Sequence, residues 1–196
     1  MDDMTRDGKD IHHTNPCEEL NYHGRITPNF TTPRPTSQTN HGYPDCHAVW
    51  DPSVLPSPLN TQLKTGSVFS TTNAAGDTAC AASRQPPTLC FPSHTAPLDI
   101  KFNANGTAAY VAFHGSWDKA PPDGFRVSRV AFNPDTGLPV EPLTSTSAAL
   151  DIMFNGDNGA CPNRCFRPVG LAWDKKGRLF MASDSTNEVW VVGGAE

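Results

Sequence analysis

Apolar segments recur in the last hundred residues of the chain. The prolines that open two similar stretches, Pro97 and Pro168, lie 71 residues apart, and so do the glycines that follow them, Gly106 and Gly177. Each stretch reads as a strand, a turn of Asn or Asp with Gly, and a returning strand. The matching segments are 97–102 with 168–173 and 110–112 with 180–182.

A second strand pair is predicted after each of these hairpins, over 125–132 and over 188–192. Each repeat then holds about four antiparallel strands, the unit of a β-propeller blade. Because a blade buries both faces against its neighbours, and closed propellers have roughly four to eight blades, two clear blades and parts of others make an open ring. The pattern predicts an all-β partial propeller of about three blades.

The first half of the chain shows less alternation. Residues 1–26 are polar, 27–40 read as an exposed loop, and the proline-rich segment 51–97 predicts a long loop insertion. The 19 prolines and 15 glycines favour short strands and turns. The net charge of −5 is scattered, which argues against nucleic acid as a partner. No apolar run approaches the roughly 18 residues of a membrane helix.

The six cysteines suggest an oxidising compartment. Cys80 with Cys90, and Cys161 with Cys165, are spaced like staples across loops, although six reduced thiols are the alternative. Asn29 and Asn105 begin glycosylation sequons. The polar, acidic start of the chain has no signal peptide, so the protein is either cytosolic or secreted with its true N-terminus missing; the second reading is favoured.

Four groups of residues stand out along the chain, at 10–24, 42–46, 113–127 and 166–180. In this order they resemble sorbosone-dehydrogenase-like proteins, and the cysteines of the chain make it similar to the fungal pyrroloquinoline-quinone (PQQ) pyranose dehydrogenases. The resemblance covers residues 1–192. It implies a six-bladed propeller, of which residues 1–196 are the C-terminal part, binding PQQ and Ca²⁺ and oxidising a sugar hydroxyl.

Arg167 and His114 are the first candidates for cofactor binding. PQQ carries three carboxylates, which arginine's planar fork suits, and the resemblance places Arg167 on one of them. The alternative is a surface arginine paired with Asp151 or Asp184. His114 ends an apolar strand and precedes glycine, where it can face a ligand; the alternative is a buried, hydrogen-bonded histidine.

His94 and Thr95 open the first repeat as Arg167 opens the second, so they are expected to reach the same site. Glu18 is the candidate calcium ligand, because its loop offers carboxylate and carbonyl oxygens at short separation. A solvated acidic turn is the alternative. If Cys17 is oxidised to Cys46, the geometry of this loop survives.

The resemblance also implies what is missing. The family's proton-accepting histidine comes from earlier blades, so no catalytic base is assigned here and the chain is expected not to oxidise sugar alone. A haem domain or a copper oxygenase is the expected electron acceptor. A secreted, non-enzymatic propeller remnant that binds carbohydrate or a partner protein is the second hypothesis, and a calcium-dependent propeller hydrolase ranks last.

Overall fold

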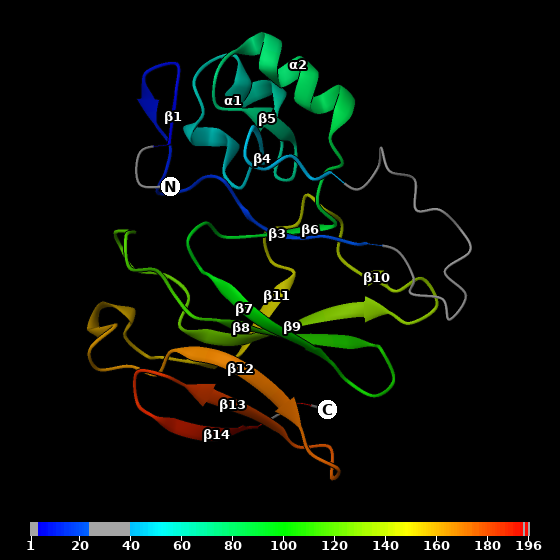
Figure 1. Cartoon of the computed structure of the whole chain (residues 1–196), viewed down its shortest axis with the longest axis vertical. Helices are drawn as coiled ribbons and strands as arrows, with labels where there is room; N and C mark the ends of the chain where they lie inside the picture. The colour runs from blue at the N-terminus through cyan, green and yellow to red at the C-terminus, as the bar shows by residue number, and fades with distance from the viewer. Residues whose placement is uncertain (1–3, 24–39, 194, 196) are drawn as a thin grey trace. The chain divides into compact units, whose positions relative to one another are not determined.

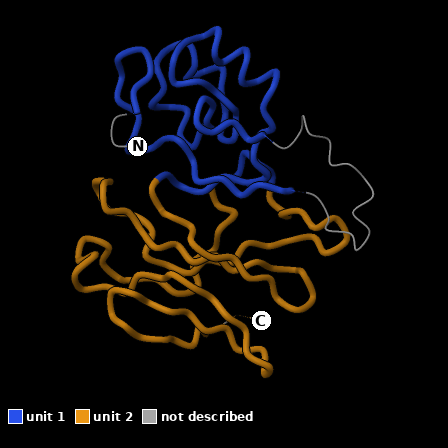
Figure 2. Tube along the Cα trace, in the orientation of Figure 1, with its two compact units in different colours: residues 1–93, 142–145 blue, residues 94–141, 146–196 orange. Residues whose placement is uncertain are grey.

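The computed structural model of the chain describes residues 4–23, 40–193 and 195. These residues form two compact units, which are described separately (Figure 2). Unit 1 comprises residues 1–93 and 142–145, and unit 2 comprises residues 94–141 and 146–196.

Unit 2 begins with a five-stranded antiparallel sheet (Figure 1). Three strands follow one another as a meander, and the last of them, β9, pairs on its outer edge first with β11 and then, at its end, with β10. The strands are β7 (Pro97–Phe102), β8 (Ala108–Phe113), β9 (Arg126–Asn133), β10 (Leu138–Pro139) and β11 (Ala149–Phe154).

The second sheet of unit 2 is a three-stranded meander, preceded by the short 3₁₀ helix η2 (Asn158–Ala160). Both repeats predicted from the sequence are therefore confirmed as hairpins with a following strand. The segments 125–132 and 188–192 each form one strand, so the prediction of a strand pair in each was wrong. The strands are β12 (Pro168–Trp173), β13 (Leu179–Ser183) and β14 (Glu188–Val192).

The core of unit 2 lies between its two sheets. Strand β12 packs on β7 and β8, and alternate residues of β13 point into the core, as the two-residue period of a strand requires. Asp99 of β7 ties the sheets together, because its Oδ2 accepts a hydrogen bond of 2.8 Å from the backbone N–H of Leu171 in β12. The buried core residues are Ala108, Tyr110, Ala112, Val127, Leu171, Leu179, Met181, Val192 and Ala195.

Unit 1 consists of three two-stranded ladders and short helices. The ladders pair β1 with β2, β3 with β6, and β4 with β5, all antiparallel. The elements are β1 (Thr5–Arg6), β2 (Lys9–Asp10), β3 (Glu18–Leu20), β4 (Cys46–Ala48), η1 (Pro52–Val54), α1 (Leu59–Gln62), β5 (Val68–Ser70), α2 (Ala74–Ser83) and β6 (Leu89–Phe91).

Helix α2 corrects the prediction of a long loop over 51–97 and makes the fold mostly β rather than all-β. Five of its ten residues are alanine, the best helix former. The side chain of Asn73 caps its N-terminus by accepting from Gly76 N. Asp77 in the first turn binds the buried Arg6 guanidinium through two hydrogen bonds of 2.8 and 2.7 Å. The prolines elsewhere in the segment masked this local preference.

The disulfides are Cys17–Cys90, Cys46–Cys80 and Cys161–Cys165. The third was predicted and is confirmed, whereas the predicted Cys80–Cys90 staple and the Cys17–Cys46 alternative were wrong. Pairing follows the ladders: Cys90 lies in β6 beside β3, which follows Cys17, and helix α2 packs on β4 and β5, with its Cys80 bonded to Cys46.

Within the described residues, the longest helix has ten residues, too few to cross a bilayer. The count of about three propeller blades stays a prediction.

Candidate functional site

Two side chains meet where the first strands of the two sheets begin and β8 ends. His114 directly follows β8, and its backbone N–H donates to Ala96 O at 2.9 Å. Arg167 directly precedes β12, and its backbone N–H donates to Ser183 Oγ at 3.0 Å. The 71-residue repeat places these segments at corresponding ends of neighbouring sheets in unit 2.

The Arg167 guanidinium reaches back to the end of β8. Its Nη2 lies 3.1 Å from Nδ1 of His114 and donates to Gly115 O at 3.3 Å, and its Nε donates to His114 O at 3.3 Å. Its Cζ lies 5.7 Å from the centre of the Phe125 ring, within the range of a cation–π contact. The structure thus brings together the first two candidates that the sequence singled out.

These contacts fix the tautomer of His114. Arginine nitrogens only donate, so Nδ1 of His114 is the acceptor from Arg167. The proton of the neutral ring then sits on Nε2, which lies 3.0 Å from Oδ2 of Asp184 and donates to it. The His114 side chain keeps 19% of its surface exposed, so the Arg167–His114–Asp184 chain borders solvent.

Arg167 makes no ion pair within the described residues, so the alternative of a surface arginine paired with an acid does not hold there. Asp151 binds Arg126 and Ser128 instead, and Asp184 binds His114. The partners of the guanidinium are two carbonyls and an imidazole acceptor, and Nη1 makes no hydrogen bond in that part of the chain. A cation without a neutralising carboxylate fits a carboxylate of PQQ.

Thr95 and His94 lie next to this pair. The buried Thr95 accepts the N–H of Gly115 on its carbonyl at 3.0 Å. His94 Nδ1 lies 3.0 Å from Oδ1 of Asp118, and its side chain is only 8% exposed. His94 and Ala96 both have positive φ, 62° and 49°, which costs roughly 1–2 kcal/mol for each non-glycine residue. Backbone strain of this kind collects at functional sites.

Two glycines permit the close packing around Thr95. Gly115 has φ +95°, and a Cβ there would collide with the Phe125 ring. Gly124 has φ +98°, and a Cβ there would meet Gly115 Cα at 2.5 Å and Thr95 O at 3.1 Å. Only glycine suits either place.

Asn155 supports the backbone on which Arg167 stands. Its Nδ2 donates to Phe125 O and to Phe166 O, both at 2.9 Å, and its Oδ1 accepts from Phe166 N at 3.2 Å. The Cys161–Cys165 disulfide closes the preceding loop, and Cys165 O accepts from Ser185 Oγ at 2.7 Å. Arg164, in that loop, is exposed.

The loop between His114 and β9 is held by Asp123. Its carboxylate accepts from Arg126 Nη1 at 2.6 Å and from Gly124 N at 2.7 Å, and Lys119 Nζ lies 3.3 Å away. Burial acts to raise the pKa of Asp123, but the hydrogen bond and charge of Arg126, with Gly124 and Lys119, outweigh it and lower the pKa.

Glu18 lies in unit 1, and not in an open loop. It is half-buried in β3, opposite Phe91 of β6. Asn15, three residues earlier, is fully buried; its Oδ1 accepts from Trp50 N and its Nδ2 donates to Asp51 O. Across residues 4–23, 40–193 and 195, no three His, Cys, Asp or Glu side chains gather as a metal site. Calcium also binds backbone carbonyls, which such a side-chain cluster does not include, so Glu18 as its ligand stays a prediction.

Sequence reasoning missed Asp118, Asp123 and Asn155, and it named Asp184 for the wrong partner. Asp118 carries no signal, because only the fold brings it close to His94. Asp123 carries a local one, because its partners Lys119, Gly124 and Arg126 lie within four residues along the chain. Asn155 carries a weak signal, since it directly follows β11 and lies before the disulfide loop that precedes Arg167.

Three comparisons relate the chain to known proteins. The TrAA12-like family matches residues 1–195. The chain is 44% identical over 195 residues to a pyrroloquinoline quinone-dependent sugar dehydrogenase of Hypocrea jecorina (strain QM6a), covering 98% of this chain and 42% of that protein. It is 36% identical over 196 residues to a pyrroloquinoline quinone-dependent pyranose dehydrogenase of Coprinopsis cinerea, covering 94% and 26%.

Solved structures agree with these matches. A calcium structure of the Trichoderma reesei Carbohydrate-Active Enzymes Family AA12 protein superimposes with a TM-score of 0.86 at 45% identity, over 97% of this chain and 46% of that one. The holo form of the pyranose dehydrogenase PQQ domain from Coprinopsis cinerea gives 0.83 at 37%, over 98% and 48%. The chain spans less than half the length of these relatives. Its match over nearly every residue shows that it belongs to the TrAA12-like family.

Proposed function

We propose that this chain supplies part of the cofactor site of a PQQ-dependent sugar dehydrogenase. The observation that carries the proposal is the Arg167 guanidinium, which is held in place by His114 and Gly115 yet pairs with no carboxylate among the described residues. A bound tricarboxylate would provide the missing anion. The relatives named for PQQ-dependent activity support this choice of ligand.

The residues of the chain have separate roles in this proposal. Arg167 binds a cofactor carboxylate, and His114 holds Arg167 in position through Nδ1 while donating from Nε2 to Asp184. Thr95, which is buried, and His94 precede β7 beside this pair and remain candidates for the same site. When bound, PQQ supplies an ortho-quinone that accepts a hydride from the sugar. No residue of this chain is assigned as the base that takes the hydroxyl proton.

The remaining parts of the proposal rest on the family. A calcium structure is known for an AA12 relative, and we expect Ca²⁺ to be required, with Glu18 as its candidate ligand here. Sugar is the substrate class, and a haem domain or copper oxygenase is the expected electron acceptor. The three disulfides suit an extracellular protein. The chain alone is expected to bind PQQ without oxidising a pyranose, because none of its residues is assigned as the base.

Titrating the 196-residue chain with PQQ tests the proposal. We expect saturable binding that Arg167→Ala weakens at least about tenfold, the effect of losing a hydrogen bond to a charged group. The matched control is Arg164→Ala, three residues away and exposed, which should bind as the unchanged chain does. Equal loss in both variants would indicate attraction by net charge alone and contradict the assignment of Arg167.

The same titration distinguishes a PQQ-binding chain from the second hypothesis, a non-enzymatic binding module. A folded chain that binds a pyranose or a polysaccharide but not PQQ would favour a non-enzymatic binding module. Turnover of a pyranose with PQQ, Ca²⁺ and a dye acceptor would contradict the expectation that this chain lacks its base.

A further inference from the structure

The turn between β7 and β8 carries a sequence whose use the cofactor site does not explain. Asn105-Gly106-Thr107 is an acceptor sequence for Asn-linked glycosylation, and the structure places it on a surface turn, where such sites occur. We propose that Asn105 carries an Asn-linked glycan, and that its first sugars cover a hollow beside the turn.

The side chain of Asn105 is presented for modification. It is exposed, and its Oδ1 accepts from Thr107 Oγ1 at 2.6 Å and from Thr107 N at 3.2 Å. Its Nδ2, the atom that is glycosylated, makes no hydrogen bond within the described part of the chain. In the transfer, Nδ2 loses a proton and bonds to the first sugar of a lipid-diphosphate-linked oligosaccharide. The bond from that sugar to the diphosphate breaks, and the diphosphate leaves with the electron pair.

The bonds that close the hairpin do not involve Nδ2 of Asn105. Asn103 closes it instead: its backbone N–H donates to Ala108 O and its Oδ1 accepts from Ala108 N, both at 3.0 Å. Gly106 supplies the positive φ of 70° that the turn needs. A glycan on Asn105 therefore leaves the bonds that close the hairpin intact.

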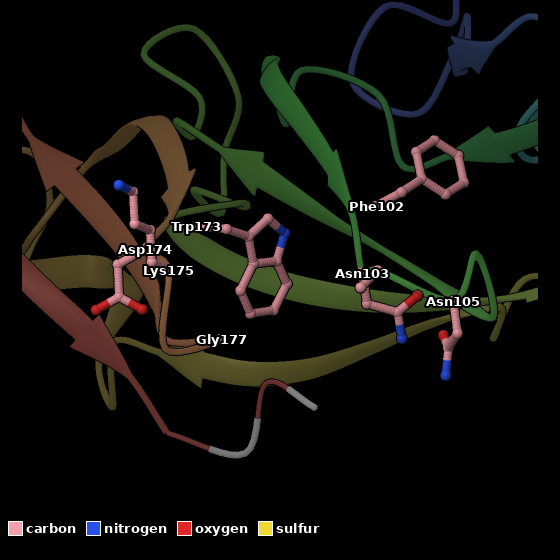
Figure 3. Close-up of a pocket in the computed structure, with 8 residues that line it drawn as sticks. Phe102, Asn103, Asn105, Trp173, Asp174, Lys175 and Gly177 are labelled. Atoms are coloured by element: carbon pink, nitrogen blue, oxygen red, sulfur yellow. The ribbon is translucent and has the colours of Figure 1, made fainter.

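Asn105 also lines a hollow in unit 2 of about 640 Å³ (Figure 3). The turns of the two repeated hairpins form it, with Asn103 on one side and Trp173 and Lys175 on the other. The exposed ring of Phe102 and the exposed ammonium of Lys175 also border the hollow. A sugar ring suits this lining, because its C–H face packs on aromatic surface and its hydroxyl and acetamide oxygens accept from N–H groups.

The sequon lies at the opposite end of β8 from the candidate cofactor site. β8 runs from Ala108, next to Thr107, to Phe113, next to His114. Six residues of strand span about 20 Å. The glycan is thus independent of the proposed PQQ site, and either proposal can fail without the other.

Secreting the chain from a yeast that glycosylates asparagine tests the proposal. Trypsin releases residues 102–119 as one peptide, because it cleaves after Lys101 and after Lys119 and no Lys or Arg lies between them. We expect this peptide to carry hexose and N-acetylhexosamine masses, and a single N-acetylhexosamine after an endoglycosidase that leaves the first sugar. Glycan loss scored as Asn-to-Asp conversion is not suitable, because an Asn-Gly pair also deamidates spontaneously.

Variants locate the sugar. Asn105→Gln and Thr107→Ala should lose the glycan completely, whereas Thr107→Ser, which keeps the hydroxyl, should retain it. All are made in an Asn29→Gln background, so that only one sequon remains. A secreted chain whose 102–119 peptide is recovered wholly without sugar would overturn the proposal.

A dye that fluoresces on apolar surface tests whether the glycan covers the hollow. We expect Asn105→Gln to bind more of the dye than Thr107→Ser, since the hollow is open only in the first. Equal dye binding by the glycosylated and the unglycosylated variants would overturn this half of the proposal.

Discussion

Nη2 of Arg167 lies 3.1 Å from Nδ1 of His114, and this one contact decides which nitrogen of the histidine carries the proton. We expect His114 to be the Nε2–H tautomer when neutral, donating to Asp184. Nitrogen chemical shifts of the labelled chain measure this directly. Asp184→Asn should keep the tautomer, because the amide oxygen can still accept, whereas a proton found on Nδ1 would contradict the contact with Arg167.

Replacing Gly115 should lower the free energy of unfolding more than replacing Gly137, another glycine of the same sheet. Gly115→Ala combines a positive φ with a collision against Phe125, and should lower the free energy of unfolding by roughly 3 kcal/mol or more. Gly137 also has positive φ, 70°, but nothing lies within 4 Å of a Cβ there. Its alanine variant should cost about 1–2 kcal/mol. Urea unfolding of both variants provides the comparison, and equal costs would contradict the packing described.

Removing the side chain of Asn155 should affect both stability and ligand binding. Asn155→Ala leaves Phe125 O and the N–H and C=O of Phe166 without their partner, at a cost of about 1–3 kcal/mol. The segment that ends in Arg167 then loosens, so PQQ affinity should also fall. Asn163→Ala, at an exposed position in the neighbouring disulfide loop, should change stability by less than about 0.5 kcal/mol. Unchanged PQQ binding in a folded Asn155 variant would show that Arg167 does not depend on this support.

The lowered pKa of Asp123 predicts a loss of stability in acid. Arg126, Lys119 and Gly124 bind the charged carboxylate in the folded chain, so its folded pKa lies below the ordinary value of 3.8. Its contribution is complete above that value and disappears as the pH falls through the folded pKa. Asp123→Asn should therefore be less stable than the unchanged chain near pH 6, with the difference shrinking below about pH 4. Thermal unfolding across this range measures it, and a constant difference would contradict the lowered pKa.

The repeats were predictable because their signals are local. Pro97, Gly106, Pro168 and Gly177 mark where strands start and turn, and the structure confirms both hairpins. Helix α2 was missed because an alanine-rich stretch of ten residues sits between proline-rich flanks. The pairing of Cys17 with Cys90 was out of reach for a different reason: it depends on which ladder forms.

The residues of the candidate site also fall into those with a local sequence signal and those without one. His114 and Arg167 stand out because each adjoins a strand in a recognisable motif, and the structure places them in contact. Their binding of a cofactor stays a prediction, as do the roles of His94, Thr95 and Glu18. Asp184 and Asn155 could not be assigned, because the atoms they bind come from segments 11 to 70 residues away in the sequence.

The three disulfides are distributed unevenly between the two units, and this determines which unit unfolds first in a reducing solution. The two in unit 1 close loops of 73 and 34 residues, and each removes chain entropy equivalent to about 4 kcal/mol. Unit 1 has short ladders and small apolar clusters to replace that contribution, whereas unit 2 holds its larger sheets with a single bridge of four residues. A thiol reagent should therefore melt the first unit while the second keeps its sheets, which makes an oxidising environment a condition of the complete fold.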